Sequence, residues 1–135
     1  MAILSSLSKY SDLGLLILRL GLGIMFIMHG YPKLTGGPEM WEKIGGAMGN
    51  VGINFLPVFW GFLAAFAEAV GGLLFALGLL FRPTAFALAF TMLIAALVHL
   101  SGGEGVMGAS HAIEVGIVFF GFILVGPGKY SIDKK

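Results

Sequence analysis

Three histidines, a lysine and a glutamate of this chain lie at or near the ends of apolar stretches, where they could exchange protons or bind a ligand. His29 and Lys33 end one stretch, in "FIMHGYPKL", and His99 ends another. His111 and Glu114 lie near the start of the last stretch. An ionisable side chain in a bilayer is costly unless it is paired, so each of these residues is a candidate for function.

Two kinds of chemistry suit such residues. Imidazole donors beside a carboxylate could bind the carbonyl oxygens of a quinone and exchange its protons. Imidazole and carboxylate could also bind a metal, because His111-x-x-Glu114 resembles a reversed half of the Glu-x-x-His element of di-iron bundles. Those sites use two such elements, whereas this chain has one, and it has no CxxCH motif for haem. The residues therefore favour quinone as a cofactor over metal or haem.

Four apolar stretches could position these residues in a membrane, and they predict an all-α fold, a four-helix transmembrane bundle. They cover residues 13–31, 55–81, 83–100 and 106–125, each near the 20 or so residues that a span needs. The chain is 58% hydrophobic and only 11% charged, whereas soluble domains carry about 25% charged residues. Residues 1–135 are thus expected to form one transmembrane domain. The first stretch lacks a signal-peptide cleavage site and is expected to be retained.

Composition also excludes several classes of protein. The chain has no cysteine, which rules out disulfides, thiolate nucleophiles and Cys-ligated metal centres. Its net charge of +1 offers no basic face for nucleic acid.

The positive residues predict the orientation of the bundle. Four spans place both termini on one side of the membrane. Five positive residues lie on that side, and two lie on the other: Lys9, Arg82, Lys129, Lys134 and Lys135 against Lys33 and Lys43. Short cytoplasmic loops carry the excess of Lys and Arg, so both termini are expected in the cytoplasm, with the protein in the inner membrane.

Depth counting predicts that the polar residues form a layer in the outer leaflet. With a rise of about 1.5 Å per residue, His29 and His99 each lie about 24 Å from the cytoplasmic face. His111 and Glu114 lie about 5 to 12 Å below the outer face, and Lys33 lies just above this layer. These five residues form the candidate quinone and proton site.

The same counting predicts a structural ion pair. Arg19 lies about 9 Å from the cytoplasmic face and Glu68 about 10 Å. The two are level, and pairing would satisfy both charges and fix the first two helices in register.

The sequence resembles the DoxX family of small prokaryotic membrane proteins. The matching segments are "LRLGLGIMFIMHGYPKL", "AEAVGGLLFALGLLFRP", "MLIAALVHL" and "GPGKYSID". The polar positions that match are Arg19, His29, Lys33, Glu68, Arg82, His99 and Asp133, with Glu114 a looser match.

The resemblance implies a four-helix membrane protein, some relatives of which are subunits of thiosulfate:quinone oxidoreductase or belong to oxidoreductase complexes linked to oxidative stress. We therefore expect a membrane subunit of a quinone-linked redox complex. Its expected partners are the lipid bilayer, further subunits of such a complex and other copies of this chain. The alternative is a non-enzymatic membrane protein: a small transporter, a proton path, or an assembly or scaffold subunit.

Overall fold

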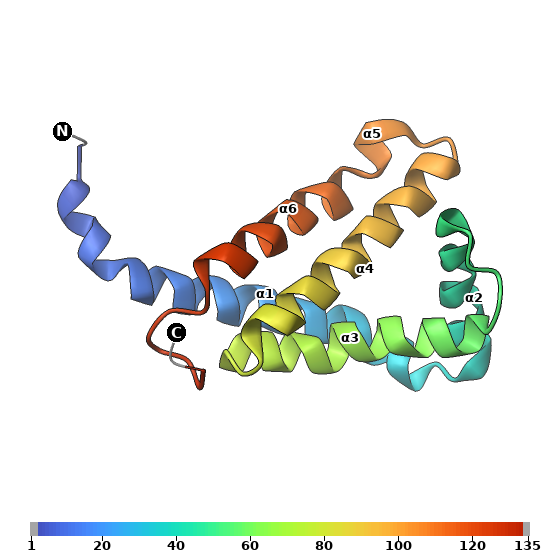
Figure 1. The fold of residues 1–135 in the computed structure, drawn as a ribbon, viewed down its shortest axis with the longest axis horizontal. Helices are drawn as coiled ribbons and strands as arrows, with labels where there is room; N and C mark the ends of the chain where they lie inside the picture. The colour runs from blue at the N-terminus through green and yellow to red at the C-terminus, as the bar shows by residue number, and fades with distance from the viewer. Residues whose placement is uncertain (1–2, 134–135) are drawn as a thin grey trace.

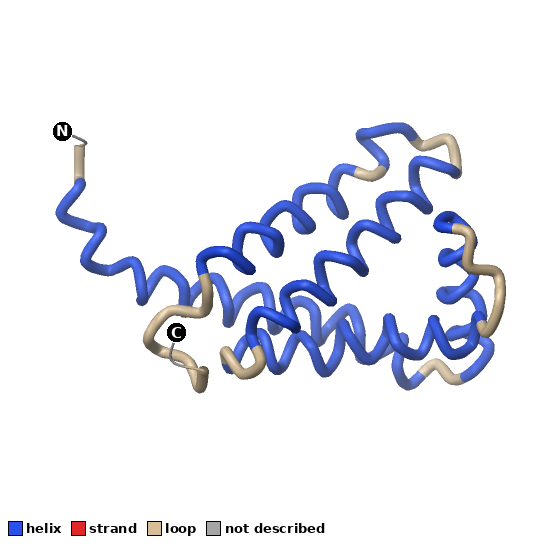
Figure 2. The backbone as a smooth tube through the Cα atoms, viewed as in Figure 1, coloured by secondary structure: helices blue, strands red, loops and turns tan. Residues whose placement is uncertain are grey.

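The computed structural model describes residues 3–133, whose helices form two arms (Figures 1 and 2). The elements in chain order are the 3-10 helix η1 (Ser5–Tyr10), α1 (Ser11–Thr35), α2 (Pro38–Gly45), the 3-10 helix η2 (Gly46–Val51), α3 (Pro57–Leu77), α4 (Phe81–Ser101), α5 (Gly105–Gly108) and α6 (Ser110–Val125). One arm is α1 packed on α3, and the other is α4 packed on α6. The arms meet near the C-terminal segment, which we call the terminal end. They separate toward α2, η2 and α5, which we call the loop end.

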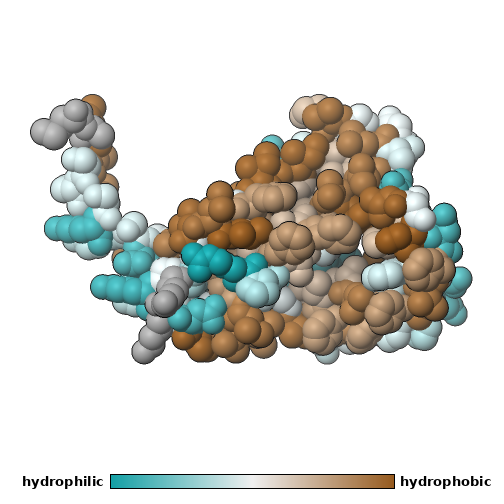
Figure 3. Space-filling model, in the orientation of Figure 1, coloured by the Kyte–Doolittle hydropathy of each residue, from teal (hydrophilic) through white to brown (hydrophobic). Residues whose placement is uncertain are grey.

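The helices and the surface of the molecule suit a membrane. Three described segments are long and apolar enough to span it, and α6 is apolar but has only 16 residues, about 24 Å. Hydrophobic residues cover the middle of the face in Figure 3, and hydrophilic residues gather toward its two ends. The expected all-α membrane class is confirmed, while the number of crossings and the side of the termini stay predictions. Lys134 and Lys135, which entered the orientation count, lie outside the described residues.

The first helix is longer than the predicted stretch 13–31. It continues through Pro32 to Thr35. Proline has no backbone N–H, so the helix continues past residue 32 without the hydrogen bond from this residue to the carbonyl of Met28. The indole Nε1 of Trp41 also donates a hydrogen bond to the carbonyl of Lys33 at 3.0 Å, which satisfies one of the last carbonyls of α1. Lys33 is therefore part of the helix and does not lie in the following loop.

The other helices also differ from the predicted boundaries. Helix α3 ends at Leu77 because Gly78 adopts a left-handed conformation with φ of 71°, a common helix stop. Helix α4 begins at Phe81, two residues before the predicted start. The predicted stretch 106–125 is divided between α5 and α6.

Glycine sets the close packing of α1 on α3. A Cβ at Gly23 would lie 2.5 Å from the carbonyl oxygen of Gly72. One at Gly30 would lie 2.4 Å from the backbone nitrogen of Ala69, so only glycine permits this approach. A Cβ at Gly21, in contrast, would have nothing within 4 Å, because this residue faces outward. Small residues thus bring these two helices together, as is usual in lipid.

A cluster of buried phenylalanines joins the two arms. Phe75 of α3 packs on Phe81 of α4 with ring centroids 4.8 Å apart, and on Phe119 of α6 at 5.1 Å. Phe26 of α1 packs on Phe119 at 5.1 Å. Phe75, Phe81 and Phe119 are fully buried. These aromatic contacts fix the arms to each other on the terminal side of the space between them.

Candidate functional site

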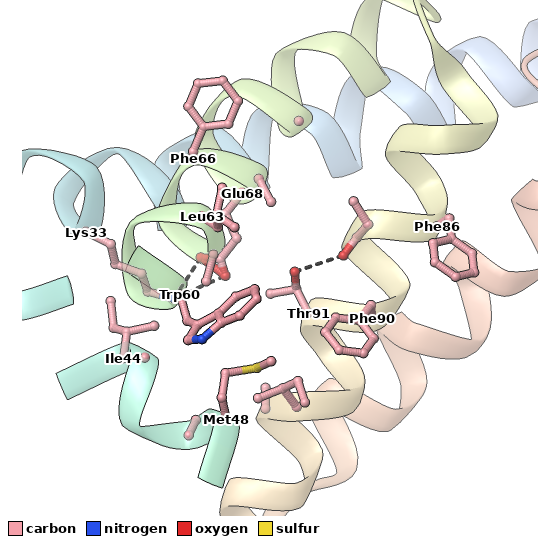
Figure 4. A pocket seen from close by; sticks show the side chains of 18 of the residues that line it. Lys33, Ile44, Met48, Trp60, Leu63, Phe66, Glu68, Phe86, Phe90 and Thr91 are labelled. Carbon is pink, nitrogen blue, oxygen red and sulfur yellow. Dashed lines mark hydrogen bonds and ion pairs between the residues drawn. The ribbon is translucent and has the colours of Figure 1, made fainter. Parts of the chain in front are cut away.

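A cavity of about 780 Å³ lies between α3 and α4, with α2 and η2 beside it at the loop end (Figure 4). Its volume is within the range of about 300 to 1,000 Å³ that is usual for small-molecule sites. Most of its lining is apolar and includes Leu63, Phe66, Phe86 and Phe90. The cavity exists because the arms separate there while η2 packs against α4.

The main polar feature of the cavity wall is an ion pair between α1 and α3. Lys33 Nζ lies 2.7 Å from Glu68 Oε1 and 3.2 Å from Oε2. The Glu68 side chain is 6% exposed and the Lys33 side chain 39%. Gly30 brings α1 close enough for this pair, because a Cβ there would lie 2.7 Å from the Glu68 Cβ. The carboxylate is thus buried, while the ammonium group remains accessible.

The predicted ion pair between Arg19 and Glu68 is wrong. Glu68 pairs with Lys33, and the fully buried Arg19 donates hydrogen bonds to the carbonyls of Ala76 and Tyr130. The two residues lie on facing helices, but Lys33 is close enough to take the carboxylate because α1 continues past Pro32. Ala76 lies in the last turn of α3, where the partial negative charge of the helix terminus favours a cation. Depth counting wrongly placed the two charges at one level, because Glu68 lies beside Gly30 and Lys33 of α1, whereas Arg19 lies beside Ala76 of α3.

The C-terminal segment closes the terminal end around Arg19. The Asp133 carboxylate accepts hydrogen bonds from the backbone N–H groups of Leu80 at 3.0 Å and Phe81 at 2.7 Å, and so caps α4. The Asp12 carboxylate accepts one from the Lys129 backbone at 3.0 Å. This segment therefore ties α1, α3 and α4 together.

Three further nitrogen-bearing side chains line the cavity, those of Lys43, Trp60 and His99. Trp60 belongs to the first turn of α3, and its buried Nε1 has no hydrogen-bond partner. His99, near the end of α4, lies with Nδ1 3.0 Å from Glu104 Oε2. An unpaired buried donor costs free energy, so a ligand oxygen that reached Trp60 would be stabilised.

The remaining predicted residues lie elsewhere. The His29 and His111 rings approach each other between α1 and α6, with centroids 6.5 Å apart, and both residues are exposed. Glu114 is also exposed. None of these three is among the residues that line the cavity, whereas Lys33 and His99 are. Within residues 3–133, no three His, Asp or Glu side chains are grouped as metal ligands would be. The predicted layer is thus divided between two sides of the molecule.

Sequence reasoning missed Trp60, Glu104 and the capping role of Asp133. Glu104 follows His99 by only five residues, which could have predicted that the two side chains meet. Trp60 was one aromatic residue among many, and Asp133 acts on residues more than 50 positions away. Only the packed structure reveals those two roles.

The fold and site together define a multi-pass helical membrane protein with an apolar cavity beside a buried ion pair. The DoxX family model matches residues 14–100. The chain is 37% identical over 134 residues to the inner membrane protein YqjF of Escherichia coli (strain K12), covering 95% of each chain. It is 31% identical over 138 residues to an uncharacterized protein of Haemophilus influenzae, covering 98% of this chain and 97% of that one. No solved structure matches.

The chain therefore belongs to the DoxX family. It is a multi-pass protein of the inner membrane, as the sequence predicted.

Proposed function

We propose that this protein is a membrane subunit of a quinone-linked redox complex and that the cavity between α3 and α4 binds the quinone. The observation that carries the proposal is the Lys33–Glu68 ion pair in the wall of a large apolar cavity. Ionisable residues in membrane-spanning helices cost free energy, and those that are kept commonly mark ligand or ion sites.

The free polar groups of the wall suit a ligand that accepts hydrogen bonds. Lys33 has three N–H donors, and its two contacts with Glu68 leave a donor for a ligand. The buried Trp60 indole N–H has no partner, and a rotation of the ring would bring it to the cavity. Both groups would then donate, as the carbonyl oxygens of a quinone require. The apolar remainder of the wall suits a planar ring.

The ion pair also suits proton exchange. A bound quinone would supply two-electron, two-proton chemistry, with its electrons exchanged with a redox partner subunit. Lys33 would donate a hydrogen bond to a ligand oxygen and pass a proton to it. Glu68 would stabilise the ammonium form of Lys33 and orient its Nζ. His99 and Glu104 lie at the loop end, where protons could enter from water.

This proposal relocates part of the site predicted from sequence. It retains Lys33 and His99, adds Glu68 and Trp60, and gives His29, His111 and Glu114 no contact with the quinone. It also argues against a proton path through the bundle, one of the alternative functions. Such a path would have to connect the outer polar residues with Arg19, and the buried Phe26 and Phe75 lie between the levels of Glu68 and Arg19 on α1 and α3.

Binding of a short-chain quinone to the purified protein in lipid nanodiscs tests the proposal. Glu68→Gln and Lys33→Met each remove one charge of the pair at similar volume, and we expect each to weaken binding about tenfold or more, since a hydrogen bond to a charged group contributes roughly 1.5 to 3 kcal/mol. Calorimetry would give the dissociation constants.

Lys9→Met is the matched control, because Lys9 is exposed in η1 at the terminal end. It should bind quinone like the unmodified protein. The proposal is wrong if the unmodified protein does not bind quinone, or if the Glu68 and Lys33 variants bind it as tightly as the control.

A further inference from the structure

The cavity is a long groove and is much longer than a quinone ring. On α4 its lining residues run from Pro83 through Ala87 and Thr91 to Val98, a rise of about 22 Å. The facing wall on α3 runs along Ala64, Ala67, Gly71 and Leu74, which recur every three or four residues. The groove therefore extends along most of the membrane-spanning part of both helices.

The polar residues are confined to one part of the groove. Lys33, Lys43 and His99 lie toward the loop end, and Glu68 lies nearer the middle. From Glu68 toward the terminal end, the lining residues are Gly71, Leu74, Leu80, Pro83, Thr84, Phe86 and Ala87, none of them ionisable. One end thus suits a polar head, and the other suits a hydrocarbon chain.

Small residues give the terminal half of the groove its width. A Cβ at Gly71 would meet Thr84 Cγ2 at 3.5 Å and Leu88 Cδ2 at 3.7 Å, which are ordinary van der Waals contacts. No close helix contact therefore requires glycine at position 71. The neighbouring Gly72 differs, because a Cβ there would lie 2.7 Å from the carbonyl oxygen of Gly23. Gly71 is thus a buried wall position where the packing accepts a methyl group, and a longer side chain there would also press on Thr84 and Leu88 of α4.

The charges near the polar end favour a neutral head group. Lys33 is paired with Glu68, and His99 is paired with Glu104. Lys43 also lines this end, and with histidine counted as neutral the two lysines balance Glu68 and Glu104. This balance suits a neutral ligand such as a quinone better than an anionic phospholipid. A phospholipid would also bring two chains to this groove.

We infer that the terminal half of the groove binds the single isoprenoid chain of the quinone, with the ring at Lys33 and the chain running toward Leu80. This inference rests on the proposed function. It makes Gly71 and Ala87 the residues that determine selectivity for long-chain over chain-free quinones. Apolar contact along the groove adds affinity with each chain carbon that is buried.

Two filling variants test the inference, one on each wall: Gly71→Leu and Ala87→Phe. Dissociation constants would be measured in nanodiscs for a chain-free quinone and for one with a long isoprenoid chain. Comparing variants with the same quinone removes its partition into lipid from the comparison. We expect both variants to bind the long-chain quinone at least tenfold more weakly and the chain-free quinone as the unmodified protein does.

Gly21→Leu is the matched control, because Gly21 faces outward with nothing near it and does not line the cavity. It should bind both quinones normally. The inference is wrong if a folded filling variant binds the long-chain quinone normally. It is also wrong if excess phosphatidylglycerol removes the extra affinity for the long-chain quinone and leaves binding of the chain-free quinone unchanged. The groove would then bind lipid. If the unmodified protein does not bind the chain-free quinone, the proposed function is wrong instead.

Discussion

The two ends of the molecule use charged residues in opposite ways. At the terminal end, Arg19 and Asp133 bind backbone groups of other elements, and Arg19 is fully buried. At the loop end, Lys33 binds Glu68 beside an open cavity, and the Lys33 side chain is 39% exposed. The difference indicates that the terminal end stabilises the fold and that the loop end is available to a ligand.

The same contrast appears in the packing. Buried phenylalanines fill the space between the arms on the terminal side, whereas the groove opens between α3 and α4. Because the phenylalanine cluster holds the arms together on the terminal side, the fold does not depend on filling the cavity between α3 and α4. Variants at the two ends should therefore change different measurements: stability at the terminal end and ligand affinity at the loop end.

The largest effect on stability is expected from Arg19→Ala. It would leave the carbonyls of Ala76 and Tyr130 unpaired and create a void, and so lower the free energy of unfolding by about 3 kcal/mol. Titration with SDS in mixed micelles would measure this. Arg82→Ala is the control, because Arg82 is exposed and donates to one carbonyl, that of Ile123 at 2.8 Å. Equal losses for the two variants would contradict a special role for Arg19.

The next effect is expected from Gly30→Ala, which acts where α1 crosses α3. The added methyl group would overlap Ala69 and Glu68, and we expect a loss of about 2 kcal/mol from overpacking. The separation of the helices should also weaken quinone binding. Gly21→Ala has open space and should change stability by less than about 0.5 kcal/mol. Unfolding in SDS would compare the two, and a Gly30 variant as stable as the Gly21 variant would show that close packing is not required.

A smaller effect is expected from Asp133→Ala. This change removes the cap of α4 and frees the C-terminal segment, which should cost about 1 kcal/mol. Affinity for a chain-free quinone should not change, because the cap lies at the far end from Lys33. Lys129→Ala is the control, since Lys129 uses its backbone N–H to bind Asp12. A change in the affinity of the Asp133 variant for a chain-free quinone would contradict the proposed separation of the two ends.

The smallest effects are expected from His29→Ala and His111→Ala. Both side chains are exposed and away from the cavity, so stability should change by less than about 0.5 kcal/mol. Calorimetric quinone affinity should also be unchanged, in contrast to Glu68→Gln. A tenfold loss of affinity in either histidine variant would restore the outer-leaflet layer as the quinone site.

Much of the fold followed from the sequence because hydrophobic length and helix signals are local. Apolar runs gave the helical membrane class. The site was only partly predictable. Position along one helix can be counted, but which residues of two helices stand level, and which side faces a neighbour, depend on how the helices pack.

The sequence by itself determined the membrane class, the family and the residues that carry charge, because these depend on composition and on local order. Tertiary structure decided which charges meet. Continuation of α1 through Pro32 brings Lys33 to Glu68, and the returning C-terminal segment brings the Tyr130 carbonyl to Arg19. Tertiary structure also decided that the arms separate along α3 and α4, and so placed the cavity beside the ion pair. Such contacts depend on helix rotation and crossing, which one-dimensional patterns do not contain.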